Sequence, residues 1–271
     1  MKRRQFLANS AAAALSVLNA HFVSSAIHSM PGKNNTSPLI KALLLQTAAP
    51  LDAMRNFYEK TIGLQVLSQT ADQLVVMGGT TSITFSYVKN KNSRPFYHFA
   101  FNIPENKIYK AFEWQKKRTP LINPRPNNTR DPMKEVVDFS HWNAHSIFFL
   151  DPAGNLVEYI ARHDLNNATT GDFSPKDILY VSEIAFIVSE VETAGNAFLN
   201  ELNLKQYRPS SPGFWPIGDE YGLLLMIDKG ITWTGHPGQA NITDVFNTVA
   251  VIEGQEKNWT LTGYPYQVLK G

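Results

Sequence analysis

One plan recurs three times along the chain: an apolar strand, a break, an amphipathic helix and a second break. The three segments are ALLLQTAAPLDAMRNFYEKTIGLQVL, HFAFNIPENKIYKAFEWQKKRTPLI and IAFIVSEVETAGNAFLNELNLKQY. In each, a helical phenylalanine stands 14 positions after the start of the strand, as in the pairs Leu43 and Phe57, His98 and Phe112, and Ile184 and Phe198. Short β-like runs follow each helix. The repeated unit is therefore β-α-β-β-β, which predicts an α+β protein built from such modules in mixed sheets.

The repeats also predict how the chain is divided. Residues 38–164 hold the first two modules and are expected to form one cupped pair. The polar stretch at residues 166–176 separates them from residues 178–271, which we expect to form a second, less complete pair. A truncated fourth copy could begin with a strand at residues 246–252, but too little chain follows it for a helix.

The stretch HSIFFLDPAGNLVEYIARHD, residues 145–164, predicts a β-hairpin, because a cluster of turn-forming residues separates two apolar, β-rich runs. Side chains alternate along a strand, so Glu158 shares a face with Leu156 and Ile160. Such a glutamate either reaches solvent at a sheet edge or is buried with a cation, a metal or hydrogen-bond donors. The strand alone leaves both alternatives open.

The N-terminal segment MKRRQFLANSAAAALSVLNAHFVSSA, residues 1–26, has the layout of a signal peptide: a basic start, an alanine-rich apolar run and small residues at its end. Its KRRQFL motif resembles a twin-arginine export signal, with an ordinary secretory signal as the alternative. We therefore expect a periplasmic or secreted protein. No later run approaches the roughly 18 apolar residues of a membrane span, so we expect no span in the mature chain.

Charge argues against nucleic acid as a partner. The formal net charge is +2, and residues 1–26 carry three basic residues and no acidic one, so the rest of the chain has a formal charge of −1. A near-neutral domain offers no electrostatic footprint for nucleic acid. The expected partner is a small-molecule substrate, and a second copy of the chain in a homodimer stays open.

The segments LDAMRNFYEKTIGL and HSIFFLDPAGNLVEY resemble the first helix and the last hairpin of the vicinal oxygen chelate superfamily, which includes glyoxalases, bleomycin resistance proteins and extradiol dioxygenases. In that superfamily, two modules form a cupped sheet around a divalent metal. The resemblance implies that His98 and Glu158 match two of the metal ligands. A site with histidine and carboxylate ligands suits Fe, Mn or Zn.

The resemblance leaves the third ligand open. The first-strand position of the opening module falls at Leu43, which cannot bind a metal, and the nearby Gln46 has the opposite strand parity. His145, His141, a water or a partner chain could complete the set. We name His145 as the candidate. Since His145 starts a strand, its alternative role is a hydrogen bond to the backbone.

The third module offers a weaker site. Glu183 or Ile184 occupies its first-strand position, depending on a one-residue slip, and residues 222–227 contain no carboxylate. We therefore expect Glu183 to be an exposed strand end and the C-terminal half to be a structural or substrate-covering partner.

Three aromatic residues, Tyr97, Trp142 and Phe148, could line an apolar substrate pocket, although core packing explains them equally well. Phe148 stands where the dioxygenases of the superfamily carry a tyrosine that helps to stabilise substrate, which weakens the case for ring cleavage.

Three functions are compatible with these residues. The first is a metal-dependent lyase, isomerase or dioxygenase-like enzyme that acts on a small substrate with vicinal oxygens. The second is a metal-free module that binds a small molecule in the same cup, as resistance proteins do. The third is a fold that has lost its site and serves assembly.

Overall fold

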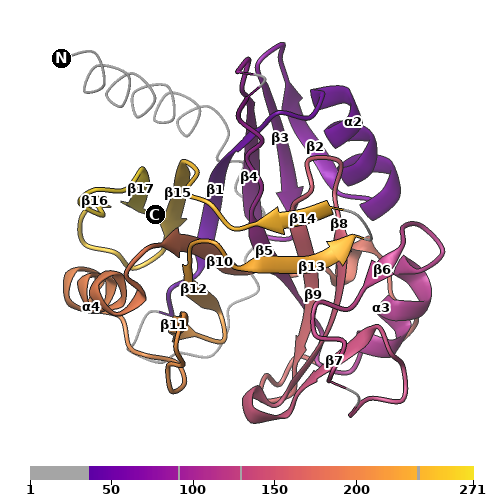
Figure 1. Ribbon diagram of the computed structural model, residues 1–271. Helices are drawn as coiled ribbons and strands as arrows, with labels where there is room; N and C mark the ends of the chain where they lie inside the picture. The colour runs from indigo at the N-terminus through magenta and orange to yellow at the C-terminus, as the bar shows by residue number, and fades with distance from the viewer. Residues whose placement is uncertain (1–36, 91, 129, 237–238) are drawn as a thin grey trace. The chain divides into compact units, whose positions relative to one another are not determined.

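The computed structural model describes residues 37–271, apart from residues 91, 129 and 237–238 (Figure 1). These residues form one compact unit. The expected signal segment, residues 1–26, lies outside the described residues, so its removal and the export of the chain stay predictions. Within the described part, no helix has the length and apolar character needed to cross a bilayer.

The first module follows the predicted β-α-β-β-β order. Its elements are β1 (Ile40–Thr47), α2 (Leu51–Arg55), the π-helix η1 (Asn56–Ile62), β2 (Gln65–Gln69), β3 (Gln73–Gly78) and β4 (Thr81–Tyr87). The helix buries an apolar stripe that includes Leu51, Met54 and Phe57. Gly63 ends the helix in the left-handed conformation, with φ of 85°, which glycine adopts without steric cost. The amphipathic helix predicted for this module is therefore confirmed.

The second module contains the predicted hairpin. Its elements are β5 (His98–Ile103), α3 (Ile108–Gln115), β6 (Leu121–Ile122), β7 (Val136–Phe139), the short 3-10 helix η2 (Ser140–Trp142), β8 (Ala144–Leu150) and β9 (Leu156–Arg162). In the turn between β8 and β9, Asp151 Oδ1 accepts the backbone N–H groups of Ala153 and Asn155 at 2.9 Å each. The side chain of the first turn residue thus fixes the hairpin.

The second half of the chain repeats the plan with losses. Its elements are η3 (Pro175–Asp177), β10 (Tyr180–Val188), α4 (Val191–Leu202), β11 (Phe214–Asp219), β12 (Gly222–Asp228), β13 (Thr232–His236), β14 (Gln239–Ile242), β15 (Thr248–Ile252), β16 (Trp259–Thr260) and β17 (Tyr266–Lys270). No helix is found between β15 and β17, where all residues are described. The predicted truncation of the fourth copy is confirmed.

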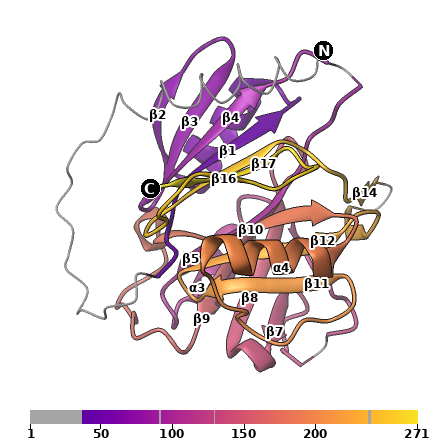
Figure 2. The same cartoon turned by 90° about the vertical axis from the view of Figure 1, so that its left-hand side faces the viewer.

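The modules pair differently from the expectation. One sheet has the order β16-β17-β15-β1-β4-β3-β2 and the other β11-β12-β10-β5-β9-β8-β6, with β7 beside β8 and with β13 and β14 paired on their own. The first module therefore shares a sheet with the fourth, and the second with the third (Figure 2). Residues 38–164 and 178–271 are not the units that share a sheet. Repeat spacing identifies modules, but it carries no information on which strand edges pair.

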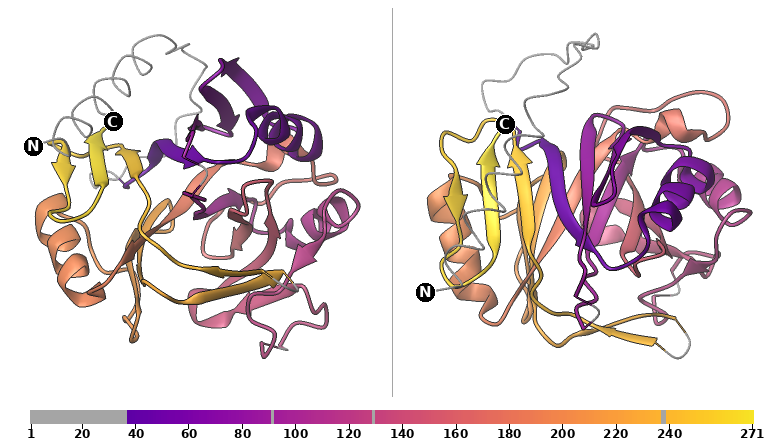
Figure 3. Two further views of the ribbon diagram at one scale, coloured as in Figure 1. Left: turned by 45° about the horizontal axis from the view of Figure 1, so that its top comes forward. Right: turned by 90° about the horizontal axis from the view of Figure 1, so that it is seen from above.

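The second sheet has two faces with different side chains, and the residues of β5 alternate between them. The orange helix α4 packs on β11 and β12, whereas the indigo α2 and magenta α3 lie toward the other end of the described part (Figure 3). In β5, Phe99, Phe101 and Ile103 join the main core, while Ala100 belongs to a second apolar cluster. Since side chains alternate along a strand, His98 lies on the same face as Ala100. We call this second face of the β5–β9–β10 sheet the inner face.

Candidate metal centre

Strand register brings three polar side chains to one place on the inner face. In the parallel pair β5–β9, Ala100 lies opposite Glu158, and in the antiparallel pair β5–β10 it lies opposite Glu183. Residues paired across strands share a face, so Glu158 and Glu183 flank Ala100 on the side to which His98 also points. The small side chain of Ala100 leaves room between the two glutamates.

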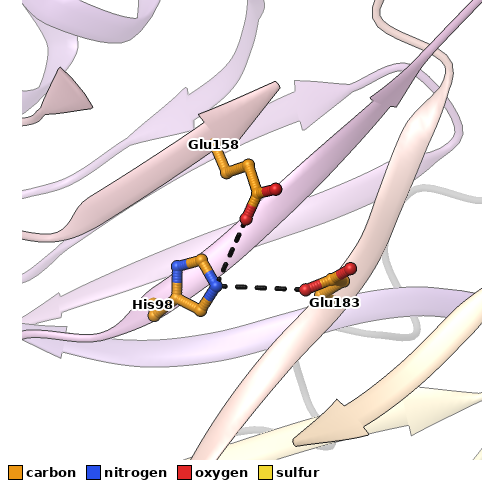
Figure 4. Close-up of side chains that lie close together, drawn as sticks. All are labelled: His98, Glu158 and Glu183. Atoms are coloured by element: carbon orange, nitrogen blue, oxygen red, sulfur yellow. Dashed lines mark ion pairs between the residues drawn. The ribbon is translucent and has the colours of Figure 1, made fainter. Parts of the chain in front are cut away.

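These three side chains form a buried cluster, which we call the His-Glu-Glu triad (Figure 4). His98 Nε2 lies 3.4 Å from Glu158 Oε2 and 3.9 Å from Glu183 Oε2. One donor atom from each residue lies within 4.8 Å of the other two. The exposed fractions are 7% for His98, 3% for Glu158 and 2% for Glu183. The buried alternative for Glu158 is therefore correct.

The orientation of His98 is set by the backbone. Its Nδ1 lies 3.0 Å from the carbonyl oxygen of Leu156. A carbonyl only accepts, so Nδ1 carries the proton and Nε2 directs its lone pair toward the carboxylates. Burial lowers the pKa of His98 to about 4, so the imidazole is neutral near pH 7. A neutral imidazole whose second nitrogen is held by a carbonyl is the usual state of a histidine metal ligand.

The positive charge near the two buried carboxylates is not enough to balance both of them. Burial raises the pKa of Glu158 well above its usual range, and the negative charge of Glu183 raises it further. Burial also raises the pKa of Glu183, although its ion pair with Arg162 opposes this effect. A divalent cation between the carboxylates would supply the missing charge and allow both to ionise.

The third module shows where a fourth ligand would stand. In the second module, Ala100 pairs with Glu158, and His98 lies two residues before Ala100. In the third module, Glu183 precedes Ala185 by two residues, and Ala185 pairs with Leu225 of β12. Leu225 therefore occupies the position equivalent to Glu158 and offers no donor atom. The triad would hold a metal through three residues and would leave its remaining positions to a substrate or water, as catalytic sites do.

Sequence reasoning found two members of the triad and missed the third. Glu183 is not an exposed strand end, so that expectation was wrong. The strand register of β5 and β10 shifts between Val181 and Glu183, and this bulge produces the one-residue slip that made the module alignment ambiguous. The usable signal was the position of Glu183 at the start of an apolar strand, equivalent to that of His98.

The structure places the other candidate ligands elsewhere. His145 Nδ1 lies 2.8 Å from His163 Nε2, and its Nε2 lies 3.8 Å from Asp131 Oδ2. The exposed His141 lies beside Phe139. Neither histidine belongs to the triad, to which one chain supplies all three residues.

The first-strand position of the opening module faces away from any site. Leu43 is fully buried in the main core, and no residue of the first sheet belongs to a metal-compatible cluster among the described residues.

The three predicted pocket residues have different surroundings. Phe148 pairs with Glu158 across β8 and β9, and its ring centroid lies 6.2 Å from that of His98. Tyr97 lines a small pocket together with His98. Trp142 packs in the apolar cluster of the inner face, with its ring centroid 5.5 Å from that of Tyr207.

Residues 43–159 match the model of the Glyoxalase/Bleomycin resistance protein/Dioxygenase superfamily. The matched residues include His98 and Glu158, and the match confirms the resemblance noted from the sequence. No curated protein sequence matches the chain.

Solved structures support the fold over a longer stretch. A candidate dioxygenase from Bacillus subtilis is 14% identical, with 80% of this chain and 70% of that chain covered and a TM-score of 0.54. Glyoxalase I from Zea mays is 14% identical, with 86% and 92% covered and a TM-score of 0.51. At these identities the likeness shows the fold alone, which is the vicinal oxygen chelate fold that the resemblance implied.

Proposed function

We propose that the protein is a divalent-metal-dependent enzyme that acts on a small organic substrate with two vicinal oxygen atoms. The observation that carries the proposal is the buried His-Glu-Glu triad with Leu225 in place of a fourth donor. Three protein ligands hold a metal and leave adjacent positions open, which is what a substrate with two neighbouring oxygens requires.

The donor set indicates the kind of metal. A neutral imidazole nitrogen and two carboxylate oxygens suit Fe, Mn or Zn, whereas Ca and Mg prefer oxygen ligands alone. When bound, the metal would polarise the substrate oxygens and stabilise negative charge that develops on them. The carbonyl of Leu156 holds His98, and Arg162 holds Glu183, so both ligands are oriented before the metal arrives.

Phe148 bears on the reaction class. It lies directly across from Glu158 on β8 and has no hydroxyl group. Under the resemblance stated above, a ring-cleaving dioxygenase would carry a tyrosine here to stabilise substrate. The phenylalanine therefore favours a lyase or isomerase over a dioxygenase.

A second candidate is a metal-free module that binds an apolar small molecule. The apolar cluster of the inner face favours it, because Ala100, Ile160 and Leu225 surround the triad with hydrocarbon. We further propose that the protein works in the periplasm or outside the cell, on the basis of the signal-like segment at residues 1–26.

Metal analysis of the purified protein without a histidine tag tests the proposal. We expect about one equivalent of Fe, Mn or Zn per chain after dialysis. Glu158→Gln keeps the size of the side chain but loses its charge, so it should lower the metal content at least about tenfold. Glu192→Gln removes the same charge from the exposed surface of α4 and should leave the metal content unchanged.

A protein that takes up none of these metals, even when they are added, would contradict the enzyme proposal. The metal-free binding module would then be the better reading, and it predicts that Glu158→Gln does not weaken the binding of apolar ligands.

A further inference from the structure

We infer that the inner face contains a binding site for an anionic group, centred on Arg162, and that the substrate therefore carries a carboxylate a few bonds from its chelating oxygens. The inference rests on the proposed function, since it concerns the substrate of the same site. Its basis is a set of buried polar atoms that no residue of the described part satisfies.

Arg162 is an unusual residue at the end of β9. It is 1% exposed, and its Nη2 forms an ion pair with Glu183 Oε1. Its Nε and Nη1 atoms are buried and have no hydrogen-bond partner among the residues that the structure describes. Buried donors are nearly always satisfied, and an arginine has five N–H groups to place. The unused donors of Arg162 therefore need an acceptor that none of the described residues provides.

A second polar side chain on the same face is in the same state. Asn102 lies opposite Ile160 of β9 and is fully buried, and both atoms of its amide group lack a partner. Along β5, Asn102 follows Ala100 and His98 at two-residue intervals, so all three point to the inner face. Unsatisfied donors thus lie on the same face as the triad, toward the Arg162 end of β9.

Charge favours an anion at this place. With neutral His98, two ionised glutamates and protonated Arg162, a bound divalent cation leaves the group with one positive charge in excess. An anionic ligand would balance that charge in a dry environment, where imbalance is costly. Arg162 is also the residue type best suited to carboxylates.

The arrangement limits the size of the substrate. One carboxylate, that of Glu183, belongs to the triad and also contacts Arg162. The anionic group must therefore lie close to the chelating oxygens. The rings of Trp142 and Tyr207 stand 5.8 Å from the guanidinium carbon and close the site on that side. A short hydroxy or oxo acid fits these limits better than a long conjugate.

Binding of glycerate and of its neutral amide to the metal-loaded protein tests the inference. Both probes carry two vicinal hydroxyl groups, and only glycerate carries a negative charge. We expect wild-type protein to prefer glycerate at least about tenfold by calorimetry, and Arg162→Gln to lose that preference. Arg208→Gln is the matched control, because Arg208 also lies beside Tyr207 but is partly exposed, and it should keep the preference.

Equal preference in wild type and Arg162→Gln would overturn the inference. Should Arg162→Gln fail to fold, nuclear magnetic resonance of the wild-type protein decides: glycerate should shift the Nε–H signal of Arg162 and the amide should not, and the absence of a shift overturns it. A protein that binds no metal but still prefers glycerate through Arg162 contradicts the proposed function and supports the anion site. A protein that binds metal but shows no preference for glycerate supports the proposed function and contradicts the anion site.

Discussion

Glu158 and Glu183 are equally buried, but they have different neighbours. Glu183 forms an ion pair with Arg162, whereas Glu158 faces the neutral imidazole of His98. In the absence of metal, the charge of Glu158 is therefore the less compensated of the two. Removing one partner of a buried ion pair leaves the other uncompensated, so the two glutamates should differ in their effect on stability.

Their substitution should separate stability from metal binding. In the presence of a chelator, Glu158→Gln should raise the midpoint of thermal unfolding by roughly 3 °C, since it removes an uncompensated carboxyl. Glu183→Gln should lower the free energy of unfolding by about 3 kcal/mol, because it leaves the buried charge of Arg162 without its ion-pair partner. With metal present, both variants should be less stable than wild type. Thermal unfolding with and without metal is the measurement, and equal effects of both variants in chelator would refute the charge assignment.

A second pair of residues joins the first module to the hairpin of the second. The Tyr58 hydroxyl donates to Asp151 Oδ2 at 2.7 Å, and both side chains are buried. Tyr58→Phe removes the donor but keeps the ring, so we expect a loss of about 1–2 kcal/mol in urea unfolding. Tyr109→Phe removes a similar bond, to Asp131, from a half-exposed tyrosine and should cost less. Equal losses would mean that burial does not strengthen the Tyr58 bond.

At the scale of elements, the polar stretch at residues 166–176 was expected to be a boundary between the two halves of the chain, but it is held to the second module by hydrogen bonds. It is attached to the start of α3 by Lys107, which is 1% exposed. The Lys107 ammonium donates to the carbonyl oxygens of Thr170, Gly171 and Asp172 at 3.0 Å each. All three donors of the ammonium are thus used, which explains how a lysine is tolerated in the interior.

Lys107→Met should loosen this connection. The methionine keeps most of the apolar stem but leaves the carbonyl groups of Thr170 and Asp172 without their donor, whereas Gly171 keeps the one from Lys110. We therefore expect a loss of roughly 2–4 kcal/mol in the free energy of unfolding. Hydrogen exchange should become faster at residues 169–173. Lys110→Met is the control, since Lys110 contacts the same stretch from an exposed position and should cost little. Unchanged exchange in Lys107→Met would show that the stretch is held by other contacts.

The sequence predicted local structure well and long-range arrangement poorly. The modules and the hairpin follow from residues close together in the chain, whereas His98 and Glu158 were selected by the resemblance to the superfamily. Glu183 was missed because its place depends on a bulge and on the pairing of β10 with β5, more than 70 positions away. Spacing along a chain does not reveal which strand edges meet.

At the scale of the whole molecule, the four modules of one chain complete both sheets, and one chain supplies the whole triad. A partner chain is not required as a source of the third ligand. A homodimer stays a prediction about assembly, separate from the site.

The mature N-terminus is a further prediction at this scale. Removal of the signal-like segment during export should give a chain that starts after Ala20 or Ala26. Mass spectrometry of the protein from its native source measures this directly. Intact Met1 in the soluble fraction would contradict export. If the signal is of the twin-arginine type, the double variant Arg3→Lys, Arg4→Lys should accumulate inside the cell as the uncleaved precursor.

The pairing of β1 with β15 also determines when the protein can fold. Leu43 lies beside Ala250, so the first sheet gains this strand only after nearly all of the chain has been made. At about 5–20 residues per second, the ribosome needs on the order of 10–40 s to travel from β1 to β15. During that time β1 keeps an unpaired edge that can pair with other chains. A chain that stops just before β15 would contain every residue of the triad and still be prone to aggregate.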